Sequence, residues 1–317
     1  MNGLILLRKT PGLTSFESLK IIKKALCTGK AGHTGTLDKF ASGLLIVLIG
    51  QAGKLASLFS FCDKEYEGQI RFGIETDTLD PEGEIIREAA IPSREKVEES
   101  LSGFRGMILQ APPAYSAIHI NGVRAHELSR QGKMPVMKKR PVTVHKLELT
   151  SFEPPFASIR VVCSSGTYIR SLARDIALAA GSCAHLNALK RTRIGGFYLS
   201  NAFDPDTFGP EVFKNDSTAL QQAVVNALQP ITPDIFTACG LPYIHIEGKY
   251  IEPIRHGQSL YGRLLKPIVN ELPLAPGNTD TGSINASAIG LFDESNRLAA
   301  VLEHKDGKWH YGHVYIN

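Results

Sequence analysis

The sequence predicts an α+β fold, with a mixed or antiparallel central sheet, flanking helices and a small β-rich module at the C-terminal end. Strand-like and helix-like segments intermix up to about residue 200, without the regular alternation of a doubly wound fold. Beyond about residue 240, short strand candidates follow one another with turn residues between them. We therefore expect a first domain over residues 1–240 and a second over residues 241–317.

An amphipathic helix is predicted near the N-terminus, in "LTSFESLKIIKKALCTG" (13–29). Thr14 and Glu17 have the spacing of a capping box, and Gly29 is a suitable C-terminal stop. The apolar residues that share one helical face are Phe16, Leu19, Ile22 and Leu26.

The next elements are predicted to be strands. The solid apolar run "LLIVLI" (44–49) is typical of a buried strand and is too short for a membrane span. "KEYEGQIRFG" (64–73) alternates like a strand with one wet face, and its inward side carries Tyr66, Gly68, Ile70 and Phe72. "DTLDPEGE" (77–84) reads as a polar hairpin, because it lacks the ligand spacing of a calcium loop.

Two more strands and a second helix complete the first domain. The strands are predicted over 142–151 and 157–163. The helix, "GTYIRSLARDIALAAG" (166–181), is closed by Gly181 and places Arg170 one turn before Arg174.

The composition and the predicted elements of the chain change after residue 200. "NAFDPDTFGP" (201–210) resembles a linker, and "ALQQAVVNAL" (219–228) predicts a short helix. A loop is expected near 266–288. The strand candidates of the β-rich module are "YIHIEG", "IGLFD", "RLAAVLEH" and "WHYGHVYI".

Charge is the first pointer to function. The net charge is only +4, but basic residues gather between Arg8 and Lys30, in "KKRPVTVHK" (138–146) and in "KRTR" (190–193). One such cluster is usually a solvated face, whereas three of them favour a polyanionic partner. The five cysteines are odd in number and contain no C-x-x-C pair, which favours free thiols in the cytoplasm.

Asp38 stands alone in the loop "GKAGHTGTLDKFASG" (29–43). An isolated aspartate in such a loop is more often a turn or cap residue. Neighbouring glycines, however, leave room for a large flat ligand, and His33 precedes the acid by five residues. With Tyr66, Tyr168 and Arg170 elsewhere in the chain, a nucleobase pocket is a reasonable hypothesis.

No pattern predicts a metal or a cofactor. "GQAGKL" (50–55) fails as a phosphate loop, since Leu55 stands where a Mg²⁺-binding Ser or Thr is required. His310 and His313 are three apart in a predicted strand, so they face opposite ways. We expect no metal site and no cofactor.

Several stretches resemble, in order, the TruB family of tRNA pseudouridine synthases. The resemblance covers residues 3–200, and the C-terminal portion is similar to a PUA-type RNA-binding module. The matching motifs are "KTPGLTS", "GHTGTLD…ASGLL", "KEYEGQIRFGIETDTLDPEG", "PPAYSAIHINGVRAHELSR", "CSSGTYIRSLARDI" and "AHLNALKRTRIGGF".

The resemblance implies the pseudouridine synthase fold and an isomerase that converts uridine 55 in the T-loop of tRNA to pseudouridine. Asp38 matches the catalytic carboxylate, Arg170 its arginine partner and Tyr66 the active-site tyrosine that stacks on uracil. The other implied substrate contacts are His33, Tyr168 and Leu189. Tyr66, Tyr168 and Leu189 also have a plain interpretation as core residues.

The chain departs from the family pattern at three positions. Lys39 follows the aspartate where proline is usual, and His119 and His126 stand where Lys and Tyr are common. These departures concern substrate fit more than the reaction itself.

Partners and rival functions follow from the same reading. We expect tRNA as the partner, bound through its T-arm, with the acceptor stem as a candidate second contact. We expect no membrane, no guide RNA, a monomeric state and a cytoplasmic location. Two rivals stay open: a non-catalytic tRNA-binding or folding protein, and a carboxylate-dependent hydrolase of the glycosidase type. The second rival normally needs another acid across the bond, and no motif supplies one.

Overall fold

The chain forms two compact units in the computed structural model, which describes residues 1–116, 118–120, 122–130, 136–209, 218–258, 288–305 and 308–315. Unit 1 comprises residues 1–38, 43–62 and 193–317, and unit 2 comprises residues 39–42 and 63–192. Each unit is described by itself below. The predicted α+β class is confirmed, since each unit combines helices with mainly antiparallel strands. The loop expected near 266–288 lies almost wholly outside the described residues.

Unit 1 is built on a buried strand, β3 (Ser42–Ile49). β1 (Gly3–Lys9) and β2 (Ala31–Thr34) both pair with it in antiparallel fashion. The remaining elements of this unit, up to the C-terminal sheet, are α1 (Ser15–Ala25), α2 (Ala56–Ser60), β13 (Phe197–Tyr198), α6 (Thr218–Ala227) and α7 (Pro233–Ala238), with 3₁₀ turns at Gly50–Leu55, Leu199–Asn201 and Pro205–Phe208.

Both faces of β3 are buried, which explains its unbroken apolar sequence. Leu44, Ile46 and Leu48 belong to a cluster with α2, β13 and α7. The alternate residues Leu45, Val47 and Ile49 belong to a second cluster with α1 and α6. Successive side chains of a strand point to opposite faces, so a strand between two apolar layers needs an apolar side chain at every position.

The N-terminal helix α1 confirms part of its prediction. Thr14 and Glu17 form the expected capping box. Leu19, Ile22 and Leu26 are buried, but Phe16 is 63% exposed, so its place on the apolar face was wrong. The helix also ends before the stop predicted at Gly29. Its last residue is Ala25, and Cys27 adopts the left-handed conformation.

The stretch that resembles a linker is tied to β1. Phe203 donates its N–H to Leu6 O at 2.7 Å, and its carbonyl accepts from Arg8 N at 2.9 Å. The Arg8 guanidinium also lies 2.8 Å from Asp204. Phe203 therefore forms an isolated bridge with β1, and the ion pair of Asp204 holds the same stretch to Arg8.

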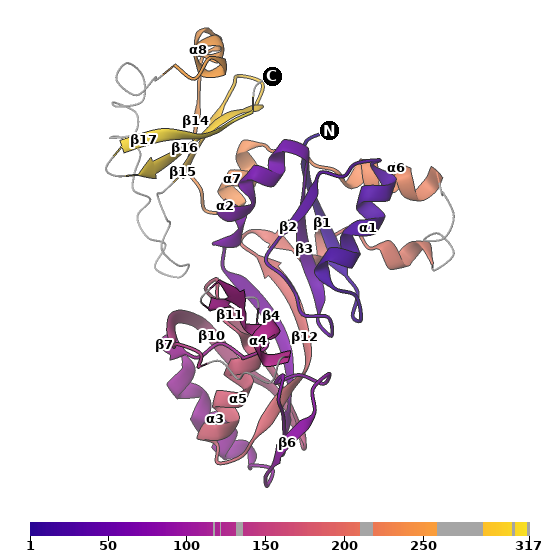
Figure 1. Ribbon diagram of the computed structural model, residues 1–317, viewed down its shortest axis with the longest axis vertical. Helices are drawn as coiled ribbons and strands as arrows, with labels where there is room; N and C mark the ends of the chain where they lie inside the picture. Colours follow the sequence, from indigo (N-terminus) through magenta and orange to yellow (C-terminus); the bar gives the residue numbers. More distant parts are fainter. Residues whose placement is uncertain are drawn as a thin grey trace. The chain divides into compact units, whose positions relative to one another are not determined.

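The C-terminal strands form the expected small sheet. Among the described residues its order is β14 (Tyr243–His245), β15 (Ala288–Phe292), β16 (Leu298–Lys305) and β17 (Lys308–Val314), with α8 (Ile251–Arg255) and a 3₁₀ turn at Gly248–Tyr250 beside it (Figure 1). Its first pair is parallel and the other two are antiparallel. Phe292 joins the same apolar cluster as β3, and its ring lies 5.2 Å from that of Phe236 on α7. The division at residue 240 stays a prediction.

Unit 2 contains a sheet with the order β12 (Ala184–Ile194, in this unit up to Thr192), β4 (Lys64–Phe72), β11 (Phe156–Cys163), β10 (Arg140–Glu153) and β7 (Gly106–Gln110). β4, β11, β10 and β7 pair in antiparallel fashion. α5 (Ile169–Ala179) packs on β4, and α3 (Arg94–Leu101) packs on α5 and β10 (Figure 1).

Smaller elements complete unit 2. The polar turn predicted at 77–84 joins β5 (Ile74–Thr76) to β6 (Ile85–Glu88). Strand β4 alternates between buried and half-buried residues as predicted, and Gly181 closes the turn after α5 with a φ of 75°. The others are β8 (His119–Ile120), β9 (Val123–Arg124), α4 (Ala125–Arg130) and a 3₁₀ turn at Ser102–Phe104.

Candidate active site

Asp38 is half-buried in the loop between β2 and β3 of unit 1. The residue before it, Leu37, is 3% exposed and is bound at both backbone groups by one side chain. Ser15 Oγ accepts the Leu37 N–H at 2.9 Å and donates to the Leu37 carbonyl at 3.1 Å. Ser15 is the first residue of α1 and is 2% exposed. The loop is therefore anchored to a helix end directly before the carboxylate.

The strand before this loop carries the other predicted residue of unit 1. His33 lies on β2 opposite Val47 of β3 and is half-buried. Gly35, two residues later, has a φ of 72°, a conformation that a residue with a Cβ adopts only at a cost. The glycine turn lets the chain leave the sheet before it reaches Leu37 and Asp38.

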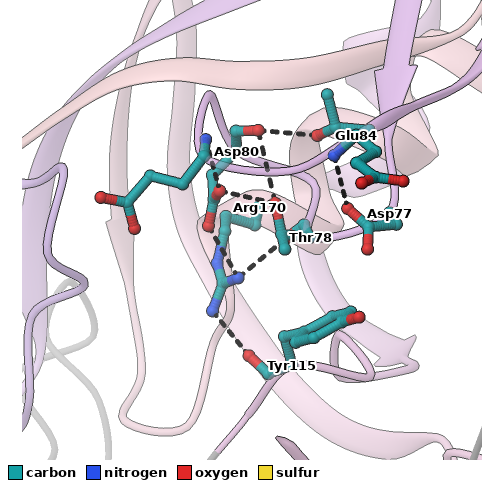
Figure 2. Close-up of polar contacts among 8 residues, drawn as sticks. Asp77, Thr78, Asp80, Glu84, Tyr115 and Arg170 are labelled. Atoms are coloured by element: carbon teal, nitrogen blue, oxygen red, sulfur yellow. Dashed lines mark hydrogen bonds and ion pairs between the residues drawn. The ribbon is translucent and has the colours of Figure 1, made fainter. Parts of the chain in front are cut away.

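Arg170 of unit 2 is 5% exposed at the start of α5, and its guanidinium is held at several points (Figure 2). Nη1 donates to the Thr78 carbonyl at 2.8 Å and lies 3.1 Å from Asp80 Oδ2. Nη2 donates to the Tyr115 carbonyl at 3.0 Å. A buried guanidinium needs such partners, because an uncompensated charge in the interior is strongly unfavourable.

Asp80, the acid beside Arg170, is itself fixed by the hairpin turn. Its Oδ1 accepts from Thr78 Oγ1 at 2.6 Å and from the Glu82 N–H at 3.1 Å. The Thr76 hydroxyl donates to the Asp80 carbonyl at 2.7 Å. Asp80 is 5% exposed, and both of its carboxylate oxygens are bonded, so it fixes the orientation of the Arg170 guanidinium.

The outer end of the turn is equally constrained. Asp77 accepts the Glu84 N–H at 2.9 Å (Figure 2). A Cβ at Gly83 would collide with the side chains of Asp77 and Thr78, so only glycine fits there. The motif "DTLDPEG" thus builds a turn that presents Asp80 to Arg170, a role that its reading as a plain polar hairpin missed.

Tyr168 is positioned by Gln110. The Gln110 side chain is 2% exposed at the end of β7. Its Oε1 accepts the Tyr168 N–H at 2.8 Å and its Nε2 donates to the Tyr168 carbonyl at 3.1 Å. The residue before α5 is therefore fixed by an amide whose importance no sequence motif had indicated.

Tyr66 and Leu189 lie on adjacent strands, β4 and β12, and are both 8% exposed. Tyr66 shares a face of β4 with Gly68. A Cβ at Gly68 would lie 3.3 Å from Leu186 of β12 and 3.7 Å from Ile169 of α5. The start of α5, which carries Arg170, thus packs on the Tyr66 face of the sheet.

The structure therefore gathers the elements that carry Tyr66, Tyr168, Arg170 and Leu189 in unit 2, while His33 and Asp38 belong to unit 1. The pairing of Asp38 with Arg170 stays a prediction. Lys39, the departure from the usual proline, has its Nζ 3.8 Å from Glu82 Oε1 of the hairpin turn. Within the described ranges, no group of three His, Cys, Asp or Glu side chains could hold a metal ion, and no helix is long and apolar enough to cross a membrane.

Comparison with solved structures shows that the fold is shared with known proteins. Two solved structures align over 99% of this chain: one titled a Cbf5-Nop10-Gar1 complex (TM-score 0.65, 23% identity, 84% of that chain), and an H/ACA RNP bound to a substrate RNA containing 2'-deoxyuridine (TM-score 0.66, 22% identity, 85% of that chain). At this identity they show the shared fold alone.

Sequence relatives show the family. Residues 23–169 match the model of the TruB family pseudouridylate synthase N-terminal domain. A Borreliella burgdorferi protein named tRNA pseudouridine synthase B is 48% identical over 204 residues, 63% of this chain and 72% of that protein. A Treponema denticola protein of the same name is 38% identical over 300 residues, 82% of this chain and 84% of that protein. The chain belongs to the TruB family of pseudouridylate synthases and is an isomerase, as its motifs predicted.

Proposed function

We propose that the protein converts uridine 55 in the T-loop of tRNA to pseudouridine, with Asp38 as the catalytic carboxylate. The observation that carries this proposal is the anchoring of the Asp38 loop, in which the buried Ser15 hydroxyl binds both backbone groups of Leu37. A catalytic group must be held accurately, and rigid attachment one residue away serves that need. The tRNA pseudouridine synthase B relatives supply the substrate class.

The reaction is an isomerisation, so atoms and electrons balance within the nucleotide. The N1–C1′ bond breaks, the uracil rotates, a C5–C1′ bond forms, C5 loses a proton and N1 gains one. The base must first leave the stack, as for other enzymes that act on a base. Asp38 could attack C1′, add to C6 of the uracil, or remove a proton from C2′, and all three routes use one ionised carboxylate.

The other residues take supporting roles. Arg170 pairs with the ionised Asp38 and orients it, while Asp80 and two backbone carbonyls hold the guanidinium in place. Tyr66 stacks on the uracil and assists proton transfer at C5. Tyr168 and Leu189 contact the flipped nucleotide, and His33 contacts the T-loop and keeps the target base out of the stack.

Replacing Asp38 tests the assignment. Asp38→Asn should abolish tritium release from tRNA that carries 5-tritiated uridine, while tRNA affinity stays within about twofold, because catalysis and binding use different groups. Glu98→Gln is the matched control, since it makes the same chemical change on an exposed side chain of α3. Measurable turnover by Asp38→Asn would refute the role of Asp38.

Product and position tests separate the remaining possibilities. Wild-type protein should produce pseudouridine at position 55, and a tRNA with cytidine at that position should release no tritium. Release of free uracil would instead identify a hydrolase. Tight tRNA binding without any pseudouridine would favour the non-catalytic folding protein. A monomeric, guide-free cytoplasmic enzyme completes the proposal, and activity of the purified protein alone on transcribed tRNA tests its independence of a guide.

A further inference from the structure

The segment Ser182–Leu186, at the end of the α5–β12 connection, binds the β5–β6 hairpin from one side to the other. Every contact lies within unit 2. The hydrogen bonds are Ser182 Oγ to Ala90 O (2.6 Å), Gly73 N to Cys183 O (2.8 Å), Cys183 Sγ to Arg87 O (3.7 Å), His185 Nδ1 to Ile74 O (2.9 Å) and Leu186 N to Leu79 O (3.1 Å).

Two of these contacts fix the part of the hairpin that holds Arg170. His185 binds Ile74 at the start of β5, and Leu186 binds Leu79, the residue directly before Asp80. Leu79 has a φ of 61°, a left-handed conformation that is unfavourable for a residue with a Cβ. A strained turn of this kind keeps its shape only when its surroundings fix it.

His185 makes the more selective contact of the two, because it uses a side chain. The imidazole is 3% exposed. A carbonyl oxygen can only accept, so Nδ1 carries the proton and donates it to Ile74 O. Burial lowers the pKa of His185, although the bond to Ile74 raises it, so the neutral ring is favoured.

We propose that His185 is a positioning residue for catalysis: its Nδ1–H ties β5 to β12 and thereby keeps Asp80 and the Thr78 carbonyl where they orient Arg170. Loss of this bond removes the side-chain tie of β5 to β12, while the backbone bonds of Cys183 to Gly73 and of Leu186 to Leu79 remain. The guanidinium then loses its fixed direction, although the fold remains. This inference rests on the proposed role of Arg170 as the partner of Asp38.

Two amide substitutions separate positioning from packing. In His185→Asn the side-chain amide nitrogen occupies nearly the position of Nδ1, so it can still donate to Ile74 O. In His185→Gln the amide is one carbon further out and misses that position. Both variants bury a neutral amide of similar size, so a purely structural role predicts similar behaviour for both.

The measurement is the turnover of pseudouridine formation with tRNA in excess, together with tRNA affinity and thermal melting. We expect His185→Gln to lower kcat by about 10- to 100-fold with an unchanged Kd, since small misplacements of a catalytic group have effects of this size. His185→Asn should retain kcat within about threefold of wild type. Equal kcat values in the two folded variants, or a loss that appears in Kd instead of kcat, would overturn the inference.

A double variant tests the route through Asp80. If His185 acts by holding Asp80, then His185→Gln should add little further loss of kcat to Asp80→Asn. Multiplicative losses would show that the two residues act independently and would overturn the inference. Failure of this inference can be told apart from failure of the proposed function. Wild-type protein that leaves uridine 55 unmodified refutes the function. The comparison of variants tests the role of His185 and requires only an active wild type.

Discussion

Single polar side chains that bind one residue's backbone at two points occur in both units. Ser15 binds the N–H and carbonyl of Leu37, and Gln110 binds those of Tyr168. In each case the bound residue adjoins or is a predicted site residue. A two-point bond removes the rotation that one hydrogen bond leaves free, so it fixes direction as well as position.

Ser15→Ala should reduce catalysis more than binding. The substitution leaves two buried backbone groups of Leu37 without their partner, at a cost of about 1–3 kcal/mol in unfolding free energy. With Asp38 less firmly held, kcat should fall about tenfold or more while the Kd for tRNA stays constant. Steady-state kinetics and urea unfolding measure the two effects.

Ser18→Ala provides the control for that variant. Ser18 is also buried on α1, but its hydroxyl donates to the Thr14 carbonyl of its own helix, 3.0 Å away. Its removal should spare kcat. If both serine variants lost activity equally, the effect would come from α1 and not from the bond to Leu37.

The pKa of His185 predicts an acid-sensitive contribution to stability. Burial lowers this pKa below the ordinary 6.5, with Arg71 acting in the same direction and the Ile74 bond and Asp80 opposing. The unfolded chain therefore binds more protons, and the contribution is present above pH 6.5 and lost as the pH falls through the lowered folded value.

Asparagine at position 185 removes the titration and keeps the donor. The difference in unfolding free energy between wild type and His185→Asn should be constant above pH 6.5 and should shift against wild type below it. Urea titrations on both sides of that pH measure the difference. A pH-independent difference would mean that His185 titrates normally in the folded protein.

The sequence could name residues of the site but not the residues that position them. Asp38, Tyr66 and Arg170 lie in motifs that are readable along the chain. The bonds from Ser15 to Leu37, Gln110 to Tyr168 and His185 to Ile74 join residues 22, 58 and 111 positions apart. Local periodicity carries no information about such pairs, because they form only when distant elements pack.

At the scale of elements, the sequence predicted what depends on periodicity. The burial of both faces of β3, the alternation of β4 and the capping box of α1 follow from the side-chain pattern. The same reasoning was wrong for Phe16. Its ring is not in the core, and the Lys23 ammonium lies over it, 4.9 Å from the ring centroid. The linker-like composition of residues 201–210 gave no sign of the hydrogen bonds that join Phe203 to β1.

Within unit 1, Phe292 of the C-terminal sheet is fully buried, and its ring packs against that of Phe236 of α7. Phe292→Ala should therefore lower the unfolding free energy by about 3–5 kcal/mol, the usual cost of removing a core phenylalanine. Phe61→Ala is the matched control, because Phe61 is 61% exposed and its loss should cost less than about 0.5 kcal/mol. If urea unfolding gave a similar small loss of unfolding free energy for both variants, the sheet would be only loosely attached.

At the scale of the whole molecule, that packing decides how the C-terminal module can be studied. Truncation after residue 240 would remove Ala288, Phe292 and Val301 from a cluster that also contains Leu44 and Phe236. The truncated chain would expose the remaining members of the cluster. Loss of activity would then report damage to unit 1 as readily as loss of an RNA contact, so the intact chain is the better subject.

The intact chain carries its own reporter for the module. Trp309 is the one tryptophan in the sequence, lies on β17 and has its ring 5.0 Å from that of His304 on β16. If the module grips the acceptor end of tRNA, full-length tRNA should alter Trp309 fluorescence and an isolated T-arm stem-loop should not. The stem-loop should also show a higher KM with a similar kcat, because the module adds affinity without taking part in the chemistry.

Trp309→Phe is the control for that experiment. It should abolish the signal while leaving turnover on both substrates unchanged, because phenylalanine preserves the ring contact with His304. Saturating tRNA that leaves Trp309 emission unaltered, with equal KM values for the two substrates, would remove the module from tRNA binding. The C-terminal sheet would then serve to complete the apolar cluster around β3, a role that its packing already supports.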